Sequence, residues 1–164
     1  MAIVRIQANS STTSNGAATT AASFLAGTAA HSLIVLGISG TGISVTGVAD
    51  DKGNSYTQVP SARGVIHGTP DRASDLWYLP NCTAGTETIT VTYSSTIDVG
   101  TEMYLIEYSG VALAGPVETA GNVSNLNTDY LSPVGPVLTT ARTGSVLVSL
   151  ATIEDYAVDR KSTV

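Results

Sequence analysis

The segment from Thr86 to Ser94 is the part of this sequence that most restricts the possible fold. It reads TETITVTYS, so a threonine or serine occupies every second position, and Ile89, Val91 and Tyr93 lie between them. Successive side chains of a β-strand point to opposite faces, whereas a helical period would spread these hydroxyl groups around the axis. The segment is therefore predicted to be a strand with one apolar face and one hydroxyl-covered face.

Weaker forms of this alternation recur along the chain and predict further strands. They lie over residues 2–8, 32–39, 43–49, 55–59, 75–79, 99–109, 134–140 and 144–153. Residues 32–39 and 99–109 are apolar on both faces, which is typical of central strands that are covered on both sides. About ten short strands with turn signals between them, and no amphipathic helix, predict an all-β fold, an antiparallel β-sandwich of jelly-roll type.

A chain of 164 residues is long enough to form one domain with its own core. Residues 1–20 are expected to form an N-terminal strand and then a flexible arm over residues 9–20, and residues 21–164 to form the sandwich domain. The core is expected to contain the apolar members of the alternating strands. These are Ile34, Leu36, Val45, Trp77, Ile89, Val91, Leu105, Ile106, Leu147 and Val148.

The composition excludes several classes of function. Only 12% of the residues are charged, whereas serine and threonine make up about a quarter, so hydroxyl groups are expected to cover much of the surface. The formal net charge is −6, and the seven lysines and arginines form no cluster, although nucleic-acid binding requires clustered cations. No apolar run is long enough to span a membrane. We therefore expect no nucleic-acid partner and no membrane insertion.

Cys82 is the single cysteine, which excludes an internal disulfide and predicts a small buried side chain.

Four landmarks in the sequence resemble a known β-sandwich module. Residues 50–57 read DDKGNSYT and are similar to the D-x-x-G-N-x-Y-T turn of that module; LWY at 76–78 with Asn81, TITVT at 88–92 and EYSGV at 107–111 follow in the expected order. From Ala21 to Ile153 the chain thus resembles a jelly-roll or lectin-like module of bacterial extracellular proteins and phage structural proteins.

The resemblance implies surface display, adhesion or particle decoration, and it brings no catalytic residues. Members of the family usually continue with another core strand after the one that corresponds to residues 144–153, whereas this sequence ends at Val164. The resemblance therefore implies an incomplete sandwich with one unpaired sheet edge.

Asp50, Asp51 and Asn54 are the candidate ligands for a calcium ion. Calcium requires about six to eight oxygen ligands, and this cluster supplies three side chains. The alternative is a hairpin turn in which Gly53 and Asn54 occupy positions of positive φ. We expect the turn, and neither a metal nor another cofactor.

Candidate catalytic residues are few. His31 and His67 are the two possible histidine bases, and no G-x-S-x-G motif accompanies them. Glu102 and Glu107 share a strand, but their separation of five positions sends them to opposite faces, so they do not form the carboxylate pair of a glycosidase. Glu107 is expected to be buried with a hydroxyl or backbone partner. The sequence favours a protein that is not an enzyme.

Two functions from different classes fit this sequence. The first is a non-enzymatic structural protein of an extracellular particle or filament, such as a capsid-decorating, head-fibre or tail protein of a phage virion. It is expected on the virion or an extracellular surface, without a recognisable signal peptide. The alternative is a carbohydrate-binding or adhesive surface module with a surface glycan as its ligand. That module would need an exposed aromatic platform, for which the candidates are Trp77, Tyr78, Tyr104 and Tyr108. Trp77 and Tyr78 are neighbours in one strand, so they point to opposite faces.

The structural function predicts partners that are copies of this chain or other virion or filament subunits. The strand over residues 2–8 is the expected assembly strand, because it alternates and a polar tether follows it. Its contact residues are Ile3, Val4, Arg5, Ile6 and Gln7. Either this strand pairs with the sheet edge of a neighbouring copy, or it folds back onto its own chain.

Overall fold

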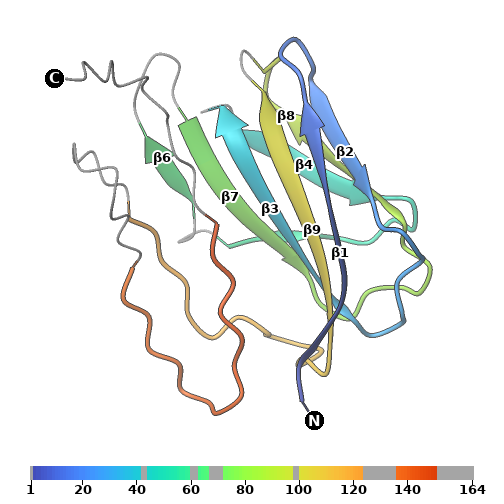
Figure 1. Cartoon of the computed structure of the whole chain (residues 1–164), viewed down its shortest axis with the longest axis vertical. Coiled ribbons are helices and arrows are strands. Elements are labelled where there is room, and N and C mark those ends of the chain that lie inside the picture. The colour runs from blue at the N-terminus through green and yellow to red at the C-terminus, as the bar shows by residue number, and fades with distance from the viewer. Residues whose placement is uncertain are drawn as a thin grey trace, which may run out of the picture.

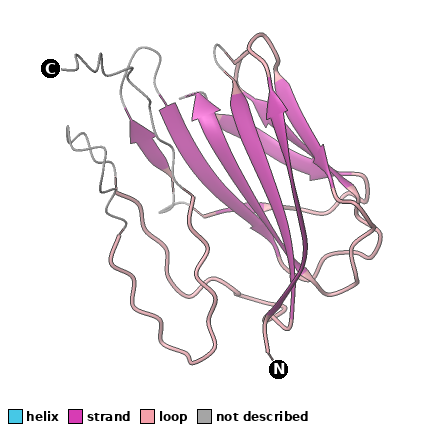
Figure 2. Ribbon diagram, viewed as in Figure 1, coloured by secondary structure: helices cyan, strands magenta, loops and turns pink. Residues whose placement is uncertain are grey.

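The computed structural model describes residues 2–41, 44–59, 63–66, 72–97, 100–123 and 136–150, and within these residues it contains nine β-strands and no helix (Figures 1 and 2). The strands are β1 (Val4–Thr13), β2 (Thr19–Ser23), β3 (Leu33–Thr41), β4 (Val45–Asp50), β5 (Thr57–Gln58), β6 (Gly64–Ile66), β7 (Arg72–Leu79), β8 (Thr88–Tyr93) and β9 (Thr101–Ser109). The all-β prediction is confirmed, and two antiparallel sheets are consistent with a β-sandwich.

The larger sheet has six strands in the order β1-β9-β3-β7-β5, with β6 also paired to β7, and the smaller sheet has the order β2-β8-β4. Every pairing is antiparallel. Figure 1 shows the smaller sheet behind the right-hand half of the larger one, with β1 at the edge of the larger sheet. This order leaves one side of β1 without a paired strand in the described chain.

β8 confirms the alternation that predicted the fold. Ile89 and Val91 have no exposed surface, and Tyr93 is 6% exposed, so these side chains form one wall of the core between the sheets. The prediction of a solvated, hydroxyl-covered face is confirmed from Thr88 onward. It is wrong for Thr86, which is fully buried. Thr86 precedes the strand and its hydroxyl donates a hydrogen bond to the carbonyl of Thr83, so strand alternation does not apply to it.

The two central strands β3 and β9 are covered on both faces, as the sequence predicts. Ile34, Leu36 and Leu105 are fully buried between the sheets. On the outer face of the larger sheet, Leu33, Val35 and Tyr108 form a second apolar cluster. These two strands therefore lie in the middle of three layers rather than two.

The remaining predicted core residues are less buried. Leu147 is 72% exposed, so its assignment to the core is wrong. Trp77 and Val45 are partly buried against the core between the sheets, while Ile106 and Val148 are partly buried in the outer cluster. A β-bulge in β4 brings Val45 and Val48 to the same core, since the register shifts between Val45 and Gly47.

The N-terminal arm is shorter than predicted. Residues 9–13 continue β1, which reaches Thr13 and is the longest described strand, and β2 begins at Thr19. Serine, threonine and asparagine over residues 9–13 suggested a loop, but each finds a partner in the antiparallel ladder with β9. Residues 14–18 alone connect the two strands.

Residues 111–123 and 136–150 form the third layer without any strand. The expected strand over residues 144–153 is absent in its described part, 144–150, and residues 136–140 of the expected strand 134–140 are also irregular. Figure 1 shows both segments beside the larger sheet, in orange and red. Val148 and Val111 pack against the outer cluster, and a cavity of about 340 Å³ remains between this layer and the sheet. The apolar run over residues 146–148 has no ladder partner in the described chain and therefore forms no strand.

Candidate functional site

Asp50 organises the turn that connects β4 to β5. Its Oδ1 accepts hydrogen bonds from the backbone N–H groups of Lys52 and Asn54, at 3.0 Å each. Its Oδ2 accepts bonds from the side-chain amide of Asn54 at 2.8 Å and from the hydroxyl of Tyr56 at 3.0 Å. Gly53 has a φ of 73°, a left-handed conformation that glycine adopts without a steric penalty. The turn motif is therefore a closed set of contacts around one carboxylate.

Asn54 extends these contacts to the loop between β7 and β8. Its Nδ2 also donates to Thr86 Oγ1 at 3.0 Å, and its Oδ1 accepts a bond from Thr83 Oγ1 at 2.9 Å. β4 belongs to the smaller sheet and β5 to the larger one. The predicted hairpin turn is therefore wrong: the turn crosses from one sheet to the other, and Asn54 bonds it to the loop between β7 and β8, which also connects the two sheets.

Asp51, the other acid of this turn, lies on the surface. Its Oδ1 accepts a hydrogen bond from the backbone N–H of Glu87 at 3.0 Å, which lowers the pKa of the Asp51 carboxyl. Its Oδ2 lies 3.7 Å from Lys52 Nζ. The oxygens of Asp50, Asp51 and Asn54 are thus used by donors of the chain itself. Within the described ranges, no group of three or more His, Cys, Asp or Glu side chains is arranged to hold a metal ion.

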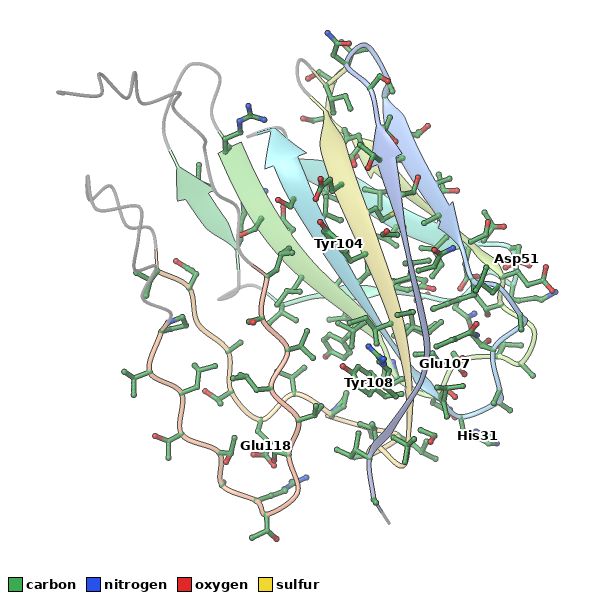
Figure 3. The ribbon with its side chains drawn as sticks, in the orientation of Figure 1. His31, Asp51, Tyr104, Glu107, Tyr108 and Glu118 are labelled. Atoms are coloured by element: carbon green, nitrogen blue, oxygen red, sulfur yellow. The ribbon has the colours of Figure 1, made fainter. Side chains whose placement is uncertain are left out.

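Glu107 is fully buried on the inner face of β9 (Figure 3). Its Oε1 accepts the backbone N–H of Ala29 at 2.9 Å, and its Oε2 accepts the side-chain amide of Gln7 at 2.7 Å. The expected backbone partner is confirmed, while the amide from β1 was not predicted. Glu102 is exposed on the opposite face of β9, as the spacing predicts.

Of the two candidate histidine bases, the structure describes His31, and its ring contacts the side-chain amide of Asn81. His31 is exposed, and its Nδ1 lies 2.5 Å from Asn81 Oδ1. Both residues have positive φ, 65° and 55°, so two neighbouring loops meet through this pair. His67 lies outside the described residues. Cys82, beside this pair, is buried with its Sγ 3.1 Å from the carbonyl of Ala29, and burial raises the pKa of its thiol.

The candidate aromatic residues do not form one platform. Trp77 packs against the core between the sheets and Tyr78 against the outer cluster, which confirms their opposite directions. Tyr108 is also buried in the outer cluster. Tyr104 is 38% exposed, and its hydroxyl donates to the carboxylate of Glu102 on the same outer face of β9.

The predicted assembly strand is β1 together with Ile3. In the structure it pairs with β9 of its own chain, which is the fold-back arrangement of the two considered. Ile3 contacts the outer cluster, Gln7 reaches Glu107, and the register shifts between Arg5 and Gln7, so that Ile6 is the extra residue of a bulge. Val4 and Ile6 are each 51% exposed.

Sequence reasoning missed a second buried carboxylate, Asp75 of β7. It is 2% exposed; its Oδ1 accepts the side-chain amide of Gln58 at 2.8 Å, and its Oδ2 lies 3.5 Å from a guanidinium nitrogen of Arg63. The alternation of Asp75 with Trp77 and Leu79 along β7 was the signal that places it on the inner face.

The comparisons with known proteins do not assign this chain to a family. No protein-family model matches the chain, and searches of curated proteins and of solved structures found no significant match. In the part of the chain that the structure describes, no helix is long and apolar enough to cross a membrane.

Proposed function

We propose that this protein is a non-enzymatic structural subunit of an extracellular particle or filament, and that it assembles through contacts at the edge of its larger sheet. The particle we propose is a phage virion, in which such a subunit serves as a capsid decoration, a head fibre or a tail protein. A jelly-roll type of sandwich is part of the same proposal.

The observation that carries this proposal is the free edge of β1. This strand has ten residues, pairs with β9 on one side, and has no paired strand on the other side within the described chain. Exposed strand edges present unpaired N–H and C=O groups to other strands. Val4 and Ile6, each half exposed on this strand, add apolar surface to the edge.

The use of the carboxylates supports a structural function. Asp50, Asp75 and Glu107 accept hydrogen bonds from side chains or backbone groups of their own chain. The bonds of Asp75 and Glu107 join separate strands and loops, while those of Asp50 close one turn. Acids that perform catalysis need free access to a substrate. Here Asp75 and Glu107 stabilise the packing of strands and loops around the larger sheet, and Asp50 stabilises the turn that follows β4.

Light scattering coupled to size-exclusion chromatography tests this proposal. We expect a defined multimer that dissociates on dilution, and a weaker multimer when Val4 and Ile6 are both replaced by lysine, because edge charges prevent strand pairing. Val137→Lys is the matched control, since Val137 is 96% exposed but lies outside β1. A strict monomer at every concentration, or catalytic turnover in a screen of glycans and esters, would overturn the proposal.

A carbohydrate-binding or adhesive module is the second candidate, and the exposed pair of Tyr104 and Glu102 favours it. A tyrosine ring can stack on a sugar while a neighbouring carboxylate accepts its hydroxyl groups. A glycan array tests this function: specific binding that Tyr104→Ala abolishes and Thr12→Ala leaves intact would favour the module over the structural subunit.

A further inference from the structure

The contacts of Gln7 are more specific than those of an ordinary edge-strand residue. Its Nε2 donates to Glu107 Oε2 at 2.7 Å and to the carbonyl of Ala26 at 2.9 Å, and its Oε1 accepts the N–H of Ala26 at 3.4 Å. Two positions along, Asn9 Nδ2 donates to the carbonyl of Ser23 at 2.7 Å. We call the edge of β9 with Glu107, Ala26 and Ser23 the acceptor site.

Glu107 makes the acceptor site selective. It is fully buried, and one of its two hydrogen-bond donors, the N–H of Ala29, comes from a loop that is fixed beside it. The second donor is the amide of Gln7, which the bound strand brings. An apolar side chain at this position would leave a buried carboxylate oxygen without a donor, and an acidic one would repel it. The site therefore requires a strand with a side-chain donor at this position.

The strand in the acceptor site is not part of the core between the sheets. None of the ten described side chains of β1 belongs to that core, and its inward-facing residues are polar. The inward-facing residues are Gln7, Asn9, Ser11 and Thr13. β1 is thus held by its ladder with β9 and by amide contacts, so an identical strand can replace it without opening the core.

We propose that β1 of one copy of this chain occupies the acceptor site of another copy, and that Glu107 recognises it through Gln7. A second copy carries the same Gln7 and Asn9 and the same bulge at Ile6, so every observed contact is reproduced. The connection over residues 14–18 turns at Gly16, whose φ is 87°, and straightening this turn lets β1 reach a neighbour. The inference rests on the proposed function, assembly of copies at the β1 edge of the larger sheet, and it adds exchange of β1 itself to the pairing at the free side of that strand.

The test uses two full-length chains, the wild type and a variant in which the amide and the carboxylate at positions 7 and 107 are exchanged. In the double variant Gln7→Glu/Glu107→Gln, the strand carries the carboxylate and the site carries the amide, so the pair is complementary within the variant but not toward the wild type. Equal amounts of isotope-labelled wild type and double variant are unfolded together, refolded and examined by native mass spectrometry. We expect each chain to assemble with itself, with mixed pairs at least about tenfold below their statistical share.

Three controls make each outcome decisive. Labelled and unlabelled wild type should mix statistically. Ala8→Glu, which places the same charge on the outward side of β1, should also mix with the wild type. The single variants Gln7→Glu and Glu107→Gln should each assemble weakly alone, and should form one-to-one complexes with each other.

Statistical mixing of wild type and double variant would overturn recognition by Glu107, while the multimer itself would still support the proposed function. A wild type that never associates would overturn the proposed function as well. A multimer in which the two single variants fail to complement each other would show that copies meet through a different surface.

Discussion

Replacing Asp50 tests whether the turn between β4 and β5 holds the two sheets together. In Asp50→Ala, the amide of Asn54 and the hydroxyl of Tyr56 both lose their ionised acceptor. The backbone N–H groups of Lys52 and Asn54 also lose their acceptor, but water near the surface can replace it. The loss of stability should therefore arise mainly from the two side-chain donors.

The expected decrease in the free energy of unfolding depends on which hydrogen bonds each donor keeps in the variant. The amide of Asn54 keeps its bond to Thr86, so its loss is near the lower end of the range of about 1.5–3 kcal/mol for bonds to charged groups. Tyr56 is largely buried, and its hydroxyl has no other hydrogen-bond partner among the described residues, so its loss lies nearer the upper end. Together these give a decrease of about 3–5 kcal/mol in the free energy of unfolding, a large part of the stability of a domain of this size.

Urea denaturation followed by the fluorescence of Trp77, the single tryptophan, measures this change. Asp51→Ala is the matched control, because Asp51 is the neighbouring acid of the same turn but is exposed to solvent. The double-mutant cycle with Tyr56→Phe should show a coupling between Asp50 and Tyr56. If Asp50→Ala costs no more than Asp51→Ala, the motif does not hold the sheets together and the reasoning is refuted.

Two further substitutions test the packing. Gly110→Ala should destabilise the fold by about 1–3 kcal/mol more than Gly115→Ala in urea denaturation: both glycines have positive φ, but a Cβ at Gly110 would collide with the carbonyl of Ala2, whereas the space around Gly115 is open. Equal losses of stability in the two variants would disprove the close contact between Gly110 and the carbonyl of Ala2. Ile89→Ala should cost about 2–5 kcal/mol in the same assay, because Ile89 is fully buried, while Thr90→Ala on the opposite face of β8 should cost much less. The reverse order would mean that the register of β8 is wrong.

The strands that the sequence predicts best are those whose apolar faces meet another apolar layer. In β8, side-chain alternation identifies the inner face, because burial of that face is the main source of stability. In β3 and β9, apolar residues on both faces correctly predict central strands that are covered on both sides. Prediction was wrong where pairing decides the outcome. Residues 9–13 are polar but have β9 as a neighbour, whereas residues 146–148 are apolar and have no ladder partner in the described chain.

The candidate sites depend on contacts between distant parts of the chain, and this limits what alternation can predict. The bond between Gln7 and Glu107 joins residues 100 positions apart, so neither residue by itself predicts the other. Asp50 and Asn54, by contrast, lie within one short motif, and the sequence correctly predicts a turn there. It does not predict that the turn joins two sheets, because the strand order is set by pairing over the whole chain.

Alkaline pH should unfold this protein through its buried tyrosines. Burial raises the pKa of both Tyr56 and Tyr93 above their ordinary value of 10.0, and the carboxylate of Asp50 raises that of Tyr56 further. In the unfolded chain both phenols ionise near pH 10, while the folded state keeps them protonated. The unfolded state then binds fewer protons, so stability is fully present below about pH 10 and falls as the pH rises above it, by up to about 1.4 kcal/mol per pH unit for Tyr56. Urea denaturation at about pH 8 and about pH 11 measures this slope, and Tyr56→Phe should flatten it, although that variant is less stable at pH 8 because it leaves Asp50 without one donor. An unchanged slope in Tyr56→Phe would mean that this hydroxyl is open to solvent and that the contact with Asp50 does not persist in solution.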